Sequence, residues 1–207
     1  MAIPFYQPVV CPVLIGRTPD LARLHTSLEQ AKSSREQVVL LCGEAGIGKS
    51  RLVAELKTEA FAQGFQVLQG NCFPEDHSCP YAPLLDLLRS IFLMSSTAQA
   101  EALVRSFARE LAPLLPEAVH TLPNLISLPP LPALDPEQEK RRLFASLAHF
   151  FLHQAAQQPL LLVIEDLHWS DDTSLEFLLY VARRCASQPL LVLLTYRSDE
   201  VRPTLSH

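Results

Sequence analysis

The chain has 207 residues, 48% of them apolar and 19% charged, which is enough to bury the core of one α/β domain. Its formal net charge of −5 argues against a broad basic face that would bind nucleic acid directly. No apolar run approaches the roughly 18 residues that span a bilayer, and residues 1–17 lack the basic start of a signal peptide, so we expect a cytoplasmic location without membrane contact.

The first half of the chain predicts a strand, a glycine-rich turn and a helix. Residues 38–42 are apolar and predict a buried strand, and residues 43–50 form the turn. Apolar residues then recur at helical spacing until Gly64, where the helix is expected to end. A second, short strand is predicted over residues 65–70.

The middle of the chain is the main irregularity. Residues 82–115 carry apolar residues at helical period and predict two helices with a break near Ser95. Repeated prolines over residues 113–136 prevent regular structure. A structureless stretch of this length is unusual in a compact domain. We therefore interpret residues 80–136 as an insertion into one domain that spans residues 1–207.

A long helix is predicted to follow the prolines. Asp135 can serve as its N-cap, Pro136 suits the first helical position, and Gln138 stands where a capping box needs it. Apolar residues then line one side of this helix: Leu143, Phe144, Leu147, Phe150 and Phe151.

The last part of the chain alternates strand and helix. Residues 160–164 and 190–195 predict buried strands. A helix between them is expected to begin at about Thr173, which could form a capping box with Glu176. Alternating buried strands and helices predict an α/β fold with a mostly parallel sheet covered on both faces.

The cysteines are scattered and form no CxxC pair, so they suggest neither a disulfide framework nor a zinc site. We expect reduced, mostly buried thiols at the five positions: Cys11, Cys42, Cys72, Cys79 and Cys185.

The glycine-rich turn matches a phosphate-binding motif. Its sequence, GEAGIGKS, fits GxxxxGK(S/T), the P-loop or Walker A pattern, between a predicted strand and a predicted helix. Inward-pointing amides and the helix N-terminus would form a nest for phosphate oxygens, which Lys49 would reach, while Ser50 would offer its hydroxyl to Mg²⁺. A plain glycine turn would explain neither of those two side chains. The residues predicted to bind ATP or ADP here are Gly43, Glu44, Ala45, Gly46, Ile47, Gly48, Lys49, Ser50 and Arg51.

Two adjacent carboxylates, Glu165 and Asp166, follow the buried strand over residues 160–164. Ligands of parallel α/β sheets bind beyond the carboxyl ends of the strands. One carboxylate could therefore hold the Mg²⁺ shell while the other orients or deprotonates water. Without the P-loop, the pair would equally fit a strand end and a helix start.

Several boxes in order resemble one family. They are LIGRTPDLARL, GEAGIGKSRLVAEL, CPYAPLLDLLR, EKRRLFASLAHF, LLLVIEDLHWSDDTSLEFL and LLVLLTYRSDE. Together they resemble the ATPase module of the STAND and origin-recognition-like AAA ATPases, found at the front of large LuxR-type regulators and multidomain signalling proteins. The resemblance implies a P-loop three-layer sandwich with AAA-like strand order and a nucleotide switch within a larger regulator.

The resemblance also implies roles for individual residues. Glu165 falls on the magnesium-side acid of Walker B and Asp166 on the catalytic-side acid. Thr195 and Arg197 match the sensor position near the γ phosphate, although Arg197 would also fit an ordinary surface arginine. The family's first box, beside the adenine, matches Ile15, Gly16 and Arg17, which would equally fit a turn before a helix.

The order of the acids departs from many P-loop ATPases, which place Asp before Glu. Here Glu165 precedes Asp166, so the base is shorter by one methylene, roughly 1.5 Å of reach. Positioning supplies most of the catalysis in phosphoryl transfer. We therefore expect slow ATP hydrolysis, which suits a switch.

In the resembled fold the Walker A strand lies between the sensor strand and a fifth strand. A helical lid, a winged helix and output domains follow in that family. The sequence given stops at His207, so we expect the strand over residues 38–42 to be an exposed apolar edge that needs a partner.

Two other functions remain open. A small-molecule kinase could use the same P-loop, but its arginine-rich lid has no counterpart, because the arginines near residues 141–142 and 183–184 lie on predicted helix faces. A scaffold that binds nucleotide without hydrolysing it would differ only in turnover. A GTPase is disfavoured because no (N/T)KxD motif occurs.

Overall fold

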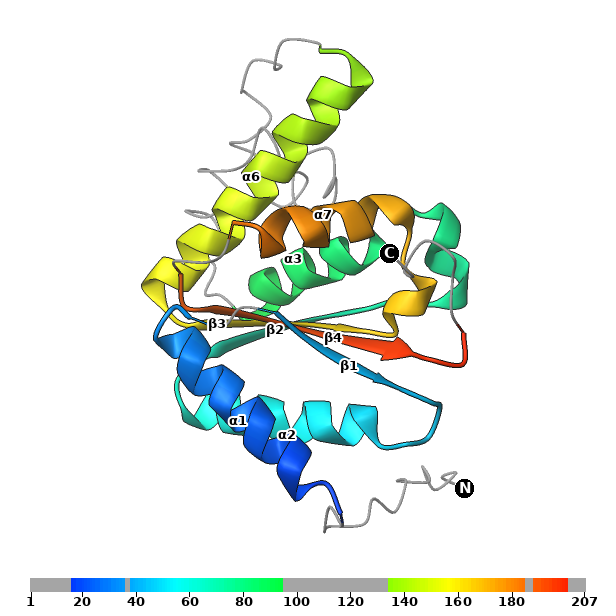
Figure 1. Cartoon of the computed structure of the whole chain (residues 1–207). Coiled ribbons are helices and arrows are strands. Elements are labelled where there is room, and N and C mark those ends of the chain that lie inside the picture. Colours follow the sequence, from blue (N-terminus) through cyan, green and yellow to red (C-terminus); the bar gives the residue numbers. More distant parts are fainter. Residues whose placement is uncertain (1–15, 36–37, 95–133, 185–187, 201–207) are drawn as a thin grey trace, which may run out of the picture.

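The computed structural model describes residues 16–35, 38–94, 134–184 and 188–200, which form a three-layer α/β sandwich (Figure 1). In chain order its elements are α1 (Thr18–Lys32), β1 (Val38–Gly43), α2 (Lys49–Ala62), β2 (Gln66–Asn71), the 3-10 helix η1 (Pro74–Ser78), α3 (Ala82–Met94), α6 (Pro136–Gln157), β3 (Leu160–Glu165), the 3-10 helix η3 (Leu167–Trp169), α7 (Asp172–Ala182) and β4 (Leu190–Arg197).

The four described strands form one parallel sheet in the order β1-β4-β3-β2. Helices α1 and α2 cover one face, and α3, α6 and α7 lie on the other (Figure 1). The predicted α/β fold with a parallel sheet covered on both faces is confirmed. β1, which carries the glycine-rich turn, lies at one edge of the described sheet, next to β4.

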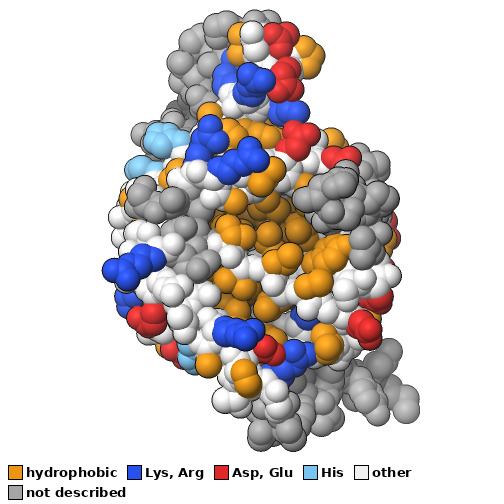
Figure 2. Space-filling view, viewed as in Figure 1, with side chains coloured by type: hydrophobic (Ala, Val, Ile, Leu, Met, Phe, Trp, Pro, Cys, Tyr) orange, Lys and Arg blue, Asp and Glu red, His pale blue; other side chains and the backbone are white. Residues whose placement is uncertain are grey.

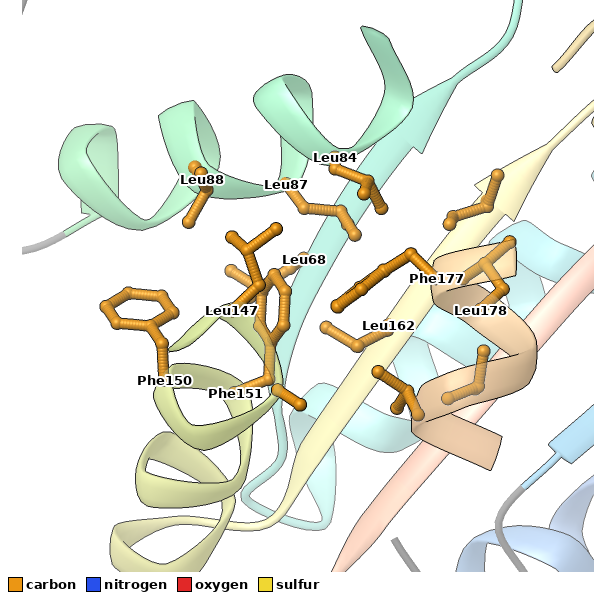
Figure 3. Close-up of a cluster of buried hydrophobic side chains, with 14 of the residues drawn as sticks. Leu68, Leu84, Leu87, Leu88, Leu147, Phe150, Phe151, Leu162, Phe177 and Leu178 are labelled. Atoms are coloured by element: carbon orange, nitrogen blue, oxygen red, sulfur yellow. The ribbon is translucent and has the colours of Figure 1, made fainter. Parts of the chain in front are cut away.

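Two apolar clusters, one on each face, hold the layers together. The cluster under α3, α6 and α7 includes Leu68, Leu87, Phe151, Leu162 and Phe177, whose side chains point toward one another in Figure 3. The second cluster joins α1 and α2 to the opposite face of β3 and β4. All of β3 except Glu165 is buried, because its residues face one cluster or the other. The site acid therefore stands at the end of the most deeply buried strand.

The helix starts were predicted with mixed success. The Asp135 carboxylate accepts from the Gln138 amide at 2.9 Å, which confirms this N-cap. The capping box at Thr173 is wrong, because α7 begins at Asp172 and its N-cap is Asp171. The buried Asp171 carboxylate accepts from the backbone amide of Ser174 at 2.9 Å. The N-cap therefore lies two residues before the predicted Thr173.

Some predictions lie outside the described residues. They include the second helix after Ser95, the proline-rich segment up to residue 133, Ile15, Cys11 and Cys185. Of the described cysteines only Cys72 is buried, and the prediction of mostly buried thiols is wrong for Cys42 and Cys79, which are exposed. Within the described residues, no helix is both long and apolar enough to cross a membrane.

Within the described residues β1 is an edge strand with exposed apolar side chains, as the resemblance implies, so the prediction of a buried strand over residues 38–42 is wrong. Along this strand Val38, Leu40 and Cys42 are exposed and alternate with half-buried residues. The first two are 36% and 54% exposed, and they lie beside Val192 and Leu194 of the α7-side cluster. Figure 2 shows apolar side chains gathered in a hollow on this side of the molecule. No described helix covers the α7-side face of β1.

Candidate functional site

The loop from Gly43 to Ser50 joins the carboxyl end of β1 to the start of α2. Gly46 and Gly48 have φ angles of 75° and 94°, in the left-handed region that favours glycine. Because α2 begins at Lys49, its free backbone amides and the positive end of its dipole face this loop. The backbone thus has the shape of an anion cradle.

Lys49 folds back into the loop. Its Nζ donates to the carbonyl oxygens of Gly43 at 2.8 Å and of Glu44 at 2.9 Å. An ammonium has three N–H groups, so these bonds leave one for an anion. Ser50 is exposed in the first turn of α2, while Arg51 pairs with Glu55 further along the helix at 2.5 Å. The other exposed loop residues are Glu44, Ala45, Gly46 and Ile47.

The two acids occupy a tight turn at the end of β3. Asp166 has a φ of 59°, a left-handed conformation that non-glycine residues rarely adopt. Its backbone N–H donates to Thr195 Oγ1 on β4 at 2.9 Å. Thr195 is only 1% exposed. The predicted sensor threonine therefore holds the turn that carries the acids.

Glu165 has a partner that sequence reasoning missed. Its Oε1 accepts from Gln69 Nε2 at 2.9 Å, and Gln69 lies on the neighbouring strand β2. The same amide nitrogen donates to Asn71 Oδ1 at 2.9 Å. Gln69 and Asn71 are two residues apart on β2, so their side chains lie on the same face of the sheet. This polar pair in the sequence could have indicated a polar partner on a neighbouring strand.

Arg197 lies opposite Gly43 in the register of β4 with β1. Its guanidinium binds Asp199 at 3.0 Å and Glu200 at 2.7 Å. The bond to Asp199 raises the pKa of Arg197 and lowers the pKa of Asp199. Both acids lie in the SDE tail of the last box, yet sequence reasoning gave them no role. The predicted sensor arginine is thus already paired with carboxylates beside the loop.

His168 lies near the charged side chains of Lys49, Arg197 and Glu200. Its side chain is buried, with Nε2 3.3 Å from a Glu200 carboxylate oxygen. Burial lowers the pKa of His168, nearby Asp166 and Glu200 oppose that effect, and Arg197 and Lys49 add to it. One ring therefore feels both the loop lysine and a β3 acid. Trp169 packs on the ring with centroids 4.5 Å apart.

The predicted groups lie together at the carboxyl end of the sheet. β1, β4 and β3 are parallel neighbours, so the loop, Arg197 and the Glu165–Asp166 pair all follow their carboxyl ends. Adjacent strands lie about 4.8 Å apart, which places the ends of β1 and β3 roughly 10 Å from each other. A chain of phosphate groups can bridge that distance.

Gly16 and Arg17 lie beside the same loop. Gly16 has a φ of 76°, and Arg17 donates to the Ile47 carbonyl at 2.5 Å and to Asp20 at 2.9 Å. A cavity of about 350 Å³ opens between α1, β1 and the loop, lined by Arg17, Leu24, Val39, Ile47 and Lys49 among others. The first box thus flanks a space next to the phosphate cradle.

The donors near the loop suit a hard cation. Ser50, Glu165 and Asp166 offer oxygen atoms, which Mg²⁺ prefers. Among the described residues, no three His, Cys, Asp or Glu side chains cluster to hold a metal by themselves. The hydroxyl of Ser50 and the two adjacent carboxylates fit Mg²⁺, which is usually bound by one or two carboxylates together with substrate phosphates.

Comparison with known proteins agrees with this geometry. Residues 13–193 match the family described as AAA ATPase domain. An uncharacterised protein of Rhizobium meliloti (strain 1021) is 28% identical over 194 residues, which is 89% of this chain and 18% of that protein. The chain therefore spans about 18% of the length of this relative.

Proposed function

We propose that this chain, which belongs to the AAA ATPase domain family, is a nucleotide switch that binds ATP and ADP with Mg²⁺ and hydrolyses ATP slowly. One observation carries the proposal. The Walker A loop, the Glu165–Asp166 pair and Arg197 follow the carboxyl ends of three neighbouring parallel strands. Residues far apart in the sequence thus lie at the same end of the sheet, which supports a shared phosphate site.

The loop and Lys49 bind the phosphates in this proposal. A phosphate accepts from the free amides at the start of α2, and Lys49 Nζ turns from the Gly43 and Glu44 carbonyls toward the β and γ oxygens. Lys49 thus exchanges hydrogen bonds to carbonyl oxygens for hydrogen bonds to phosphate oxygens. Because no bond is lost, the side chain reorganises at a small cost in free energy. In this proposal the adenine lies in the cavity that Arg17 helps to line.

In this proposal Ser50, Glu165 and Asp166 would hold Mg²⁺. When bound, Mg²⁺ neutralises charge that develops on the phosphates. The Glu165 carboxylate accepts from Gln69 Nε2. Asp166 orients or deprotonates the attacking water, and Thr195 holds the turn that aims Asp166.

Two features favour slow turnover. Aspartate at the base position is one methylene shorter than glutamate, so water must approach closer to the backbone. Arg197 must leave Asp199 or Glu200 before its charge can reach a γ phosphate. If both barriers are high, the chain binds nucleotide without hydrolysing it, which is the scaffold alternative.

The kinase alternative finds less support. Arg141 pairs with Glu137 and Arg142 with Glu139 on α6, and Arg184 lies over the Tyr180 ring at 3.6 Å. These arginines make contacts on the surfaces of their own helices. In a kinase, by contrast, the arginines of the lid over the acceptor substrate would face the phosphates.

The module acts, in this proposal, inside a larger cytoplasmic regulator of the STAND or LuxR type. The bare face of β1 supports that context, because exposed apolar edge strands are usually covered. α7 crosses from β3 to β4 on this face, and right-handed crossovers are the rule. A connection from β4 to a strand beyond β1 would therefore place its helix over Val38 and Leu40.

Thermal melting with and without Mg-ATP tests the binding proposal. Ligand at 100 times its dissociation constant adds about 2.7 kcal/mol, which raises the Tm by roughly 5 to 10 °C at this size. Lys49→Ala should abolish the shift. Lys32→Ala is the matched control, because Lys32 donates to the Gln63 carbonyl at 3.4 Å on the surface, away from the loop, and its loss should keep the shift.

No shift in either wild type or the Lys32→Ala control would refute nucleotide binding by this chain. Phosphate release from ATP, measured on the same sample, then separates the switch from the scaffold. Turnover of tens per second would contradict slow hydrolysis. Phosphate transfer to a small molecule would favour the kinase.

A further inference from the structure

Gln69 uses its whole side-chain amide in a chain of contacts between α2 and Glu165. Its Oε1 accepts from Lys57 Nζ on α2. Its Nε2 donates to Asn71 Oδ1 at 2.9 Å and to Glu165 Oε1 at 2.9 Å. All four side chains are half-buried, and Glu165 lies opposite Asn71 in the register of β2 with β3.

Lys57 decides which way the amide points. An ammonium only donates, so it must face the amide oxygen. The NH₂ group is then directed away from α2, toward the two oxygen acceptors at the end of the sheet. If the amide turned over, its oxygen would face the Glu165 carboxylate and its NH₂ would face the ammonium, and both contacts would become repulsive.

The same helix carries the phosphate-side groups. α2 begins with Lys49 and Ser50, and Lys57 follows two turns later on this rigid element. Eight residues of helix span about 12 Å. A change in the position of α2 would therefore reach the loop directly and would reach Glu165 through Lys57 and Gln69.

We propose that Gln69 is a positioning residue for Glu165, oriented by Lys57, and that this chain sets the carboxylate for Mg²⁺ relative to the P-loop helix. The inference rests on the proposed function and deepens it. Partners that orient a ligating carboxylate typically change metal affinity 10- to 100-fold when removed. A merely structural polar cluster would change folding without this selective effect.

The test measures ADP affinity by calorimetry, once with Mg²⁺ and once with EDTA. The ratio of the two dissociation constants gives the benefit from Mg²⁺. Gln69→Leu should reduce this benefit about 10- to 100-fold and change binding in EDTA by less than about twofold. Lys57→Met should reduce it by a smaller factor, because the amide remains but loses its anchor. Thr58→Ala is the control, since its exposed hydroxyl donates to the Ala54 carbonyl of the same helix.

A double-mutant cycle separates positioning from packing. In the Glu165→Gln background, Gln69→Leu should have no further effect on the Mg²⁺ benefit, because the carboxylate that it positions is gone. An unchanged benefit in both Gln69→Leu and Lys57→Met would overturn the inference and leave the proposed function standing. Equal losses with Mg²⁺ and EDTA would also overturn it. Wild type that binds no ADP would refute the proposed function itself, and the inference with it.

If Gln69→Leu fails to fold, Lys57→Met carries the test alone. Lys57 is half-buried on a helix surface, where methionine fits the same space. A folded Lys57→Met protein with the full Mg²⁺ benefit would then overturn the inference.

Discussion

The two edge strands of the described sheet differ in how they are covered. β2 lies under α3 so closely that Gly70 has no room for a Cβ beside the Pro83 carbonyl, and Leu68 is fully buried. Among the described helices none covers the α7-side face of β1, where Leu40 is 54% exposed. Both strands end at the candidate site. The rigid edge carries the side chain that positions Glu165, and the open edge carries the phosphate loop.

The difference suggests a division of labour. At the β2 edge α3 packs directly on the strand that carries Gln69. The β1 edge remains available to another segment, which could report on the loop to the rest of a regulator. Four predictions can break or sharpen this comparison.

Cysteine labelling should show the largest contrast. Cys42 is exposed on β1, whereas Cys72 follows β2 and is buried, and burial raises the pKa of Cys72 to about 12. At pH 8 its thiolate is scarcer than that of an ordinary thiol by roughly a thousandfold. A disulfide reagent should therefore label Cys42 at least about a thousandfold faster than Cys72. Variants in which Cys42 or Cys72 is the single cysteine left of the five give the rates.

Raising the pH from 8 should speed the labelling of Cys72 about tenfold per unit, because the thiolate fraction rises in this way below a pKa of about 12. Rapid labelling of Cys72 at pH 8 in folded protein would show that the β2 edge opens, and the contrast between the edges would be lost.

Core truncation should separate the edges next. Leu87 is fully buried over β2, so Leu87→Ala should cost about 2 to 5 kcal/mol of unfolding free energy. Leu40→Ala removes the same atoms from an exposed site and should cost less than about 1 kcal/mol. Urea unfolding of both variants measures the difference. Similar costs would mean that Leu40 is covered in solution.

Alanine substitutions at Gly70 on β2 and Gly43 on β1 compare how tightly the two edges are packed. A Cβ at Gly70 overlaps the Pro83 carbonyl oxygen and lies 3.2 Å from its carbon, so α3 must move. Gly70→Ala should cost about 1 to 3 kcal/mol. A Cβ at Gly43 meets only the Ile47 side chain, at 3.1 Å, and Ile47 is exposed and can move. Gly43→Ala should therefore destabilise less, and Gly43→Ala combined with Ile47→Ala should recover most of that loss.

The sequence predicts the open edge and its loop better than the rigid edge. The loop is local, because glycines, Lys49 and the following helix are contiguous and their pattern dictates one shape. Strand types, parallel order and the Asp135 cap follow from similarly local patterns. The contacts of the acids are not local. Gln69 lies 96 residues from Glu165, and Thr195 lies 29 residues from Asp166. Nothing in the spacing of such residues says which strands become neighbours.

The N-cap of α7 also depends on a non-local contact that the sequence pattern does not show. Asp171 and Thr173 are both good N-caps by residue type, and either could start a helix. The position is set by burial of Asp171, whose carboxylate also accepts from the Tyr81 amide at 3.3 Å, a contact across 90 residues. Tertiary structure therefore chose between two caps that local pattern could not separate.

The smallest effect on stability is expected from a charge at the open edge. Leu40→Lys should change the unfolding free energy by less than about 0.5 kcal/mol, because the side chain already faces water. Its effect should appear in association instead, since an exposed apolar strand pairs with other chains and a lysine prevents this pairing. Sedimentation should show wild type self-associating as its concentration rises and Leu40→Lys remaining monomeric. Phe61→Lys, at a 73% exposed site on α2, is the control for general hydrophobicity and should associate like wild type. Equal association of all three proteins would place the contact elsewhere, and β1 would then be an edge that this domain tolerates without a partner.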